Sequence, residues 1–495
     1  MHPPLRNRLL AAAGTVVAVI AGWQIANGDY GLASLLGGGI LFWLAMRLTG
    51  VRGDALLAGL LLAGYIVGNR GFAQLSVPRL PLLVGELTLG IGLGIAIWHA
   101  VVAKTLPVRR DALNLVLLTW LAFGFARLPF DMRAYGAMAL RDFALLYYAL
   151  FFFLAQAWAT GPAERRWLER CLTLAFAAAP PVFLAFARWP DFFTSNITLG
   201  GVPLVFIKSD VEGGLMVAGM YWFLQRYVTR GQRRWLVPAA ASFGAVAVSN
   251  SRAALVALGV SLLWPLVTRD FRRLRPLAAM AALGLLGLSI QTAVTKSPFA
   301  STPLYRLYES TASIVDTRGE RVYLANDLDD KPDNNQFRLV WWRAVADEVW
   351  ADDRWLGLGF GHDLAENFLR VYYGTANDDF SARSPHNFAL TVFGRMGLAG
   401  AALFAALLVA LCALLWRAGR RTARGESDGA RFTLALGAFA ILVSACFGVV
   451  LEGPMGATVF WILLGLANAT PLAATSASAP AEADESLRLA EPAAS

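Results

Sequence analysis

HNFALTVFGRMGLAGAALFAALLVALCALL, residues 386–415, is an almost uninterrupted apolar run that begins at a histidine. A helix of roughly 20 apolar residues crosses a hydrocarbon core of about 30 Å. The run is therefore long enough to span a membrane, and it predicts a transmembrane helix with His386 at one end. A polar stretch of about 90 residues, 295–385, precedes it.

The rest of the chain repeats this apolar pattern. Of its 495 residues, 57% are hydrophobic and 16% are charged, whereas a soluble domain of this length is far more polar. Some of the apolar segments are short or rich in glycine, so we expect about 12–14 spans. The chain is predicted to be all-α, a polytopic transmembrane helical bundle with these segments: 9–27, 31–49, 53–69, 82–103, 110–127, 141–158, 168–188, 212–228, 234–250, 253–268, 276–294, 386–415, 430–450 and 454–470.

The formal net charge of +9 is explained by orientation in a membrane rather than by nucleic-acid binding. Lys and Arg are enriched in cytoplasmic loops. With the N-terminus in the cytoplasm, the inner connections hold 23 Lys and Arg residues, in clusters at 6–8, 47–52, 104–110, 165–170, 226–234, 269–275 and 417–431. The short outer connections hold only 8: Arg70, Arg79, Arg127, Arg133, Arg141, Arg188, Lys208 and Arg252.

This orientation divides the chain into four parts. Residues 1–294 form a transmembrane bundle, and residues 295–385 form one large loop outside the cytoplasm. Residues 386–470 form the C-terminal transmembrane helices, and the Ala-, Ser- and Pro-rich tail 471–495 is expected to be disordered and cytoplasmic. The run 9–26 lacks a small-residue cleavage site and is interpreted as a retained span.

The large loop is predicted to contain amphipathic structure. In DNNQFRLVWWRAVADEVW, helical spacing predicts an amphipathic helix over 335–351, from Phe337, Val340, Trp341, Ala344, Val345 and Glu348. A glycine-rich turn, WLGLGFGHD, follows it, and 370–384 is expected to be an irregular loop.

His386 is the first candidate for chemistry. An imidazole with an unperturbed pKa of about 6.5 is suited to proton exchange near neutral pH. At the junction between a membrane span and an outer loop, it would meet a membrane-anchored substrate, where it predicts a general base. The alternative is a helix-start histidine bonded to a neighbouring carbonyl.

Arg252 and Arg338 are the candidate anion ligands. Arg252 lies at an outer helix start, where free backbone N–H groups favour an anion, and its guanidinium fork suits phosphate oxygens. The alternative is an interfacial arginine that reaches toward water. Arg338 follows Phe337 near the start of the amphipathic helix and is expected to point inward more than Arg343. The alternative for both is a solvated face.

Two charged clusters at outer helix starts are further candidates. Lys208, Asp210 and Glu212 lie in FIKSDVEGG, and Arg141 and Asp142 lie in YGAMALRDFALLYY. Either could contact substrate, although ion pairing that fixes helix ends is the expected role.

A metal site has little support in the sequence. Cys171, Cys412 and Cys446 form no CxxC pair, so structural zinc and a disulfide framework are not expected. The acidic DLDD, residues 327–330, is the one weak metal candidate. Neither a metal nor a cofactor is predicted.

Three elements in order resemble the O-antigen ligase-related membrane proteins. That family's signature is His, then Asn, Ser or Gln, nine residues, and Gly-x-x-Gly, matched by His386, Asn387, Gly397 and Gly400. Its Ser-x-Arg-like element is matched by SNSRAAL, with Arg252. Its Arg-x-x-x-Trp helix before a GxG turn is matched by Arg338, Trp342, Gly357 and Gly359. The motifs cover about 240–400.

The resemblance implies glycosyl transfer at the periplasmic face of a bacterial inner membrane, without a metal. The donor would be a glycan on undecaprenyl pyrophosphate, and the acceptor a lipid A–core sugar. His386 would be the base, and Arg252 and Arg338 would bind the pyrophosphate. Further candidate substrate contacts are Lys208, Asp210, Arg141, Asn387 and Arg343.

Related reactions are alternatives, namely an O-antigen or exopolysaccharide polymerase and a pilin O-oligosaccharyltransferase. A lipid-linked glycan transporter is the alternative that is not an enzyme. Transporters carry charged or broken helices near the membrane midplane, whereas the charges here gather at the outer face.

Overall fold

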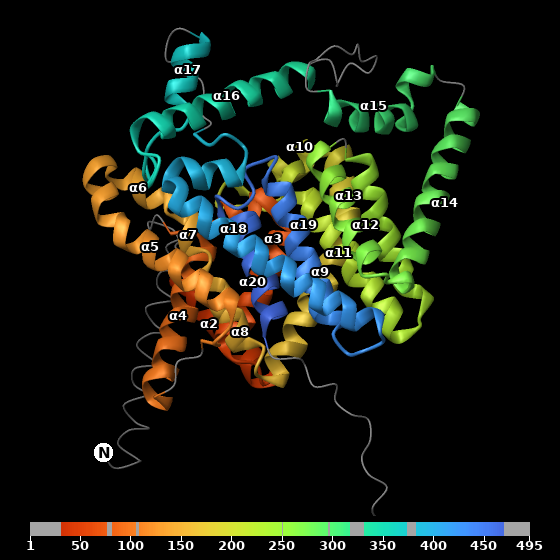
Figure 1. Ribbon diagram of the computed structural model, residues 1–495. Coiled ribbons are helices and arrows are strands. Elements are labelled where there is room, and N and C mark those ends of the chain that lie inside the picture. Colours follow the sequence, from red (N-terminus) through yellow and green to blue (C-terminus); the bar gives the residue numbers. More distant parts are fainter. Residues whose placement is uncertain are drawn as a thin grey trace, which may run out of the picture.

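The computed structural model describes residues 31–76, 82–104, 108–249, 251–295, 298–316, 331–373 and 383–469. The predicted first span, the acidic 327–330 and the tail 471–495 lie outside these ranges. The described residues are almost entirely helical, which confirms the all-α prediction (Figure 1). The one sheet among them is a two-stranded hairpin of β1 (Thr198–Leu199) and β2 (Val202–Pro203).

The helices follow the predicted spans closely. The first half of the chain forms α2 (Gly31–Thr49), α3 (Gly53–Ala73), α4 (Val84–Ala103), α5 (Ala112–Tyr135), α6 (Ala137–Asp142), α7 (Ala144–Tyr147), α8 (Leu150–Trp158), α9 (Pro162–Arg188) and α10 (Pro190–Asn196). The second half forms α11 (Ser209–Arg230), η1 (Arg233–Trp235), α12 (Leu236–Val248), α13 (Arg252–Val267), α14 (Phe271–Thr295), η2 (Phe299–Ser301), α15 (Pro303–Val315), α16 (Lys331–Asp352), α17 (Glu366–Tyr373), α18 (Phe388–Ala423), α19 (Gly429–Ala445) and α20 (Pro454–Asn468).

Seven helical segments of the described chain are long and apolar enough to cross a membrane, fewer than the 12–14 spans expected. Three further apolar helices, α13, α19 and α20, are 10–17 residues long and fall short of that length. These three helices correspond to predicted spans, and only their short length keeps them out of the seven.

The core of the bundle is built on α11, which packs against α19, α12 and α13. Small residues allow this close approach, because a side chain in place of Gly213 would meet Ala254 and one in place of Gly214 would meet Ile441. Helix α20 is buried along nearly its whole length between α8, α19 and α3.

The predicted amphipathic helix is present as α16, which lies with α15 and α17 over one end of the bundle (Figure 1). Trp341 and Val345 are buried against α17, with Phe337 and Ala344 beside them, whereas Val340 is 40% exposed. The expectation of an irregular loop from residue 370 was wrong at its start, since α17 continues to Tyr373. Its apolar face packs on α16, which favours a helix there. Residues 374–382 lie outside the described ranges.

Candidate functional site

His386 lies immediately before α18, held by the overlying helix α16. The carbonyl oxygen of Pro385 accepts a hydrogen bond from Trp342 Nε1 at 2.7 Å, and the ring of His386 lies 5.9 Å from that of Trp341. The backbone of His386 is left-handed, with φ of 55°, an uncommon conformation for a residue with a side chain. The sharp change of direction at His386 is therefore maintained by tertiary contacts.

Burial and neighbouring charge keep the imidazole of His386 neutral. The pKa of His386 is lowered to about 4, first by burial and then by the positive charges of Arg338 and Lys208, against which Asp210 acts in the opposite direction. A neutral ring has a lone pair available for a proton at neutral pH. The low pKa also makes this imidazole a weak base.

The residue after His386 begins the helix. The side-chain oxygen of Asn387 accepts from the backbone N–H of Leu390 at 3.2 Å, which makes Asn387 the N-cap of α18. Ser and Asn fulfil this role equally well. Capping therefore gives a physical reason for Asn387 at this position and places its amide in a structural role.

We predict that Asn387→Ala destabilises the protein by about 1 kcal/mol, because one N–H at the start of α18 loses its acceptor. Asn387→Ser is the matched control and should retain the stability of the wild type. The thermal midpoint of unfolding in detergent measures both. Equal midpoints for the Ala and Ser variants would show that the cap contributes nothing.

A polar cavity of about 480 Å³ opens beside His386. Its lining residues are Arg70, Arg141, Asp142, Leu145, Lys208, Arg383, Ser384, His386, Thr391, Arg395, Val449, Glu452 and Met455. Five cationic side chains against two carboxylates make it suited to an anion.

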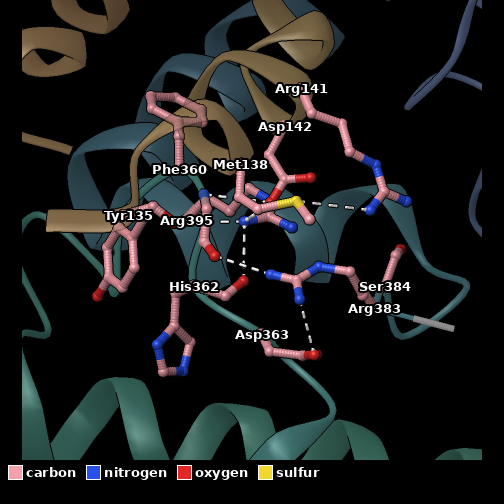
Figure 2. Close-up of polar contacts among 12 residues, drawn as sticks. Tyr135, Met138, Arg141, Asp142, Phe360, His362, Asp363, Arg383, Ser384 and Arg395 are labelled. Atoms are coloured by element: carbon pink, nitrogen blue, oxygen red, sulfur yellow. Dashed lines mark hydrogen bonds and ion pairs between the residues drawn. The ribbon is translucent and has the colours of Figure 1, made fainter. Parts of the chain in front are cut away.

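Two ion pairs, one buried and one partly exposed, shape one wall of this cavity (Figure 2). Arg395 Nη1 lies 2.9 Å from Asp142 Oδ2 and also donates to the carbonyl oxygens of Gly359 and His362. Arg383 Nη1 lies 2.9 Å from Asp363 Oδ2, while its buried Nε has no hydrogen-bond partner among the described residues. Arg395 is thus committed to the protein, whereas Arg383 keeps a donor available.

The glycine-rich turn, residues 355–363, lies between α18 and α5 and is hydrogen-bonded to both. Leu358 N donates to Gly394 O at 2.8 Å, and Arg127 Nη2 donates to Gly357 O at 2.7 Å. A Cβ on Gly397, whose φ is 59° and ψ is −154°, would lie 2.6 Å from the nitrogen of Gly357. Close approach of two backbone segments therefore explains why Gly357 and Gly397 are both glycine.

Glu452 forms the opposite wall, from the loop between α19 and α20. Its Oε1 accepts from Thr391 Oγ1 at 2.8 Å, and Thr391 Oγ1 is also 3.1 Å from Ser384 Oγ. Burial raises the pKa of Glu452, and hydrogen bonds from Ser384 and Thr391 oppose that shift. This carboxyl and His386 line the same cavity and are its two groups with shifted pKa values outside the spans.

The structure brings some predicted residues to the cavity and holds others elsewhere. Lys208 and Arg141 line it, and Lys208 Nζ also contacts Asp210 at 3.1 Å and Val449 O at 3.0 Å. Arg338 donates to Phe447 O at 3.1 Å, next to the cavity, and Arg252 donates to the side chain of Asn335 on α16.

The remaining predicted contact, Arg343, lies away from the cavity. Its side chain is 85% exposed, and it lies 3.7 Å from Asp347 on the same solvent-facing side of α16. The expected pairing within the two charged clusters holds for Lys208 and Asp210. Asp142, in contrast, pairs with Arg395 from a distant part of the chain rather than with its neighbour Arg141.

Sequence reasoning missed Arg70, Arg383, Arg395 and Glu452. A usable signal existed for two of them, because Arg395 and Glu452 are charged residues inside or next to apolar runs, where charge is costly and usually serves a purpose. Arg70 and Arg383 lack such a signal, since they lie at a helix end and in a polar loop.

A second, apolar cavity of about 770 Å³ adjoins the first. Arg141 and Glu452 line both. The rest of its wall comes mainly from α4, α6, α7, α8 and the residues next to them, with Gly453 and Pro454 beside them. It holds one further carboxylate, Glu86, but is mostly leucine and tyrosine, including Leu89, Leu93, Leu140, Tyr147 and Tyr148. A charged cavity therefore opens directly onto an apolar groove.

Among the described residues, no group of three or more His, Cys, Asp or Glu side chains could hold a metal ion. A search of curated proteins found no match to the chain. Residues 237–405 match the family model described as O-antigen ligase, and this span contains His386, Arg252 and Arg338 but ends before Glu452. The match covers about a third of the chain; it supports an O-antigen ligase-related family and points to ligase- or polymerase-type transfer of glycans.

Proposed function

We propose that this protein transfers a glycan from undecaprenyl pyrophosphate to a lipid A–core acceptor at the periplasmic face of the bacterial inner membrane. The single observation that carries the proposal is the junction of the charged cavity with the apolar groove at Arg141 and Glu452. A lipid-linked donor has the same two-part character. Its first isoprenoid units fit the groove, while its pyrophosphate and first sugar fit the cavity.

Donor activation requires neutralisation of charge on the leaving pyrophosphate. Arg141 and Lys208 line the cavity, and Arg383 Nε has no partner among the described residues, so these three are placed to bind phosphate oxygens. Arg338 next to the cavity supports the same anion. Arg252, bonded to Asn335, would join them through a change of side-chain partner. Cationic hydrogen-bond donors directed at charge that develops in the transition state contribute roughly 10²–10³-fold in rate.

His386 acts as general base on the acceptor hydroxyl. Burial, Arg338 and Lys208 all lower the pKa of His386, and bound pyrophosphate brings negative charge that opposes the effect of the two cations, so donor binding raises the pKa of His386. His386 thus becomes a stronger base when the glycan donor is bound. The deprotonated hydroxyl attacks the anomeric carbon directly, the bond to pyrophosphate breaks, and the configuration inverts.

The orientation follows from the charge asymmetry of the connections. It puts the N-terminus in the cytoplasm and the end of the bundle under α16 and α17 in the periplasm. Both substrates are anchored in lipid, so holding them at one membrane surface supplies much of the proximity that the reaction needs.

Reconstitution tests the proposal. The purified protein in lipid vesicles is given a synthetic undecaprenyl-pyrophosphate glycan together with lipid A–core, and products are separated by electrophoresis. We expect a glycan-capped lipid A–core product that depends on both substrates. Arg141→Gln should reduce its formation, whereas Arg343→Gln, on the exposed face of α16, serves as the matched control and should not.

Other outcomes identify the alternatives and would overturn the ligase proposal. Longer glycans on undecaprenyl pyrophosphate, formed from donor alone, indicate a polymerase. Transfer to pilin but not to lipid A–core indicates a protein oligosaccharyltransferase. Movement of the lipid-linked glycan between leaflets, with no new bond, indicates a transporter.

A further inference from the structure

Three adjoining cavities lie at the end of the bundle opposite His386, between α9, α11 and the start of α19. Their volumes are about 440, 150 and 40 Å³, and Glu169 lines all three. Arg226 and Arg230 of α11 line the two larger ones. The chemistry proposed for the His386 cavity uses none of these residues.

These cavities are separate from the His386 cavity. Lys208, at the start of α11, lines the His386 cavity, and Arg226 and Arg230 lie at the other end of the same helix. Helix α11 has 22 residues, which at about 1.5 Å per residue is roughly 33 Å. One helix therefore carries both sites, about one membrane thickness apart.

The largest of the three cavities is strongly cationic. Arg166 and Arg170 of α9 face Arg226 and Arg230 of α11 across it, and Glu169 is its one carboxylate. Glu169 lies 3.9 Å from Arg226, too far for a close hydrogen-bonded pair. Four guanidinium groups around one acid leave a positive charge that an anion would neutralise.

Arg226 is held in place rather than free in solvent. Its side chain is 14% exposed, and its guanidinium carbon lies 5.1 Å from the ring of Trp222 and 5.4 Å from that of Trp235. Stacking on both rings pre-organises the group. Its buried Nε nevertheless has no hydrogen-bond partner among the described residues, although a buried donor normally has one.

The surroundings of the cavities are apolar. Leu168, Leu172, Leu434 and Leu466 line the smallest cavity, and Leu174 at the edge of the largest is 70% exposed on the outside of the bundle. A ligand that combines an anionic phosphate with an apolar body would satisfy both parts of this site.

We propose that the α9–α11 cavities form a second binding site, for the phosphate group of an anionic membrane lipid. In the orientation proposed above, the site faces the cytoplasmic leaflet, where basic pockets between transmembrane helices bind lipid phosphates. Arg226 supplies the fixed donor, and Arg166, Arg170 and Arg230 supply the surrounding positive charge. The site is independent of glycan transfer, so it stands or falls separately from the proposed function.

Native mass spectrometry of the full-length protein tests the site. Protein released from phosphatidylcholine nanodiscs containing a fraction of phosphatidylglycerol should retain phosphatidylglycerol preferentially. Arg226→Gln should weaken that retention at least tenfold. Arg420→Gln is the matched control, because Arg420 stacks on Trp416 at 5.3 Å but lines none of the cavities described above. It should retain lipid like the wild type.

A further measurement distinguishes a lipid phosphate from free inorganic phosphate as the ligand. Inorganic phosphate is titrated into phosphatidylcholine nanodiscs, and the thermal midpoint is recorded. Stabilisation that Arg226→Gln abolishes, without phosphatidylglycerol retention, assigns the site to free phosphate. If Arg226→Gln fails to fold, the exposed Arg230→Gln replaces it. Equal lipid retention by the wild type and a folded variant, or no response of the wild type to either probe, overturns the proposal.

Discussion

Replacing His386 by asparagine is expected to lower the rate of glycan transfer by about 10²–10⁴-fold, the contribution typical of a positioned general base. Asparagine is the informative substitution because the backbone at His386 is left-handed, and asparagine tolerates that conformation better than alanine does. The variant should therefore insert and fold while lacking an imidazole. The measurement is initial rate in the reconstituted vesicles, beside the thermal midpoint.

His99→Asn is the matched control, since His99 is exposed on α4, far from the cavity in sequence and not among its lining residues. It should transfer glycan at the rate of the wild type. A folded His386→Asn protein with a rate within threefold of the wild type would remove His386 from the catalytic role.

The pH dependence of wild-type activity also tests His386 as the general base. Below its pKa, His386 is protonated and cannot accept a proton, so activity falls on the acid side. For the free enzyme, with a pKa of about 4, kcat/KM for the donor should hold from neutral pH to about pH 5 and then fall. In the proposed donor complex the pyrophosphate would raise the pKa of His386, so kcat should fall at a higher pH than kcat/KM does.

Glu452 could also cause the fall in activity at low pH (the acid limb), because burial raises its pKa and its carboxyl lines the same cavity. A limb that persists in Glu452→Gln belongs to His386. A limb that disappears in that variant belongs to Glu452 and contradicts the assignment.

The second large effect is expected at Gly397. Gly397→Ala should destabilise the protein by about 2–6 kcal/mol, because two costs act together. With φ of 59° and ψ of −154°, the position is close to a region that is essentially restricted to glycine, which adds about 1–3 kcal/mol. The new Cβ would also meet backbone atoms of Trp355 and Gly357 at 2.6 Å, and overpacking of this kind costs about 1–3 kcal/mol.

The neighbouring hydrogen bonds explain why the backbone cannot simply move away. Leu398 N donates to Arg354 O at 2.8 Å and Ala399 N to Trp355 O at 3.1 Å, so the glycine-rich turn replaces part of the hydrogen-bond ladder of α18. Shifting the turn would also displace Gly359, whose carbonyl oxygen accepts from Arg395 at the cavity. Loss of transfer should therefore accompany loss of stability.

Gly259→Ala is the control for this prediction. Gly259 lies in the interior of α13, and a Cβ there would meet no atom within 4 Å. Its thermal midpoint should equal or exceed that of the wild type, because alanine is the better helix former. Equal midpoints for Gly397→Ala and Gly259→Ala would contradict the close-approach explanation.

The sequence by itself determined the helical class and the positions of the long apolar helices and of α16 among the described residues, but not the short helices α10, α15 and α17. Apolar runs such as 430–450 and 454–470 correspond to α19 and α20, because in a membrane the backbone must satisfy its own hydrogen bonds and a long apolar run does so as a helix. The resemblance to the family signature grouped His386, Gly397 and Gly400, because that signature is local in the sequence.

Only the tertiary structure decided which charges meet. Asp142 stands beside Arg141 in the chain but pairs with Arg395, about 250 residues away, and Glu452 reaches Thr391 from a loop between two later helices. Neither contact has a local period or motif, because packing of distant helices creates it. The membership of the cavity, its junction with the apolar groove and the neutral state of His386 all depend on such contacts. The identity of the elements is thus a local property of the sequence, whereas the charge around His386 is a property of the assembled bundle.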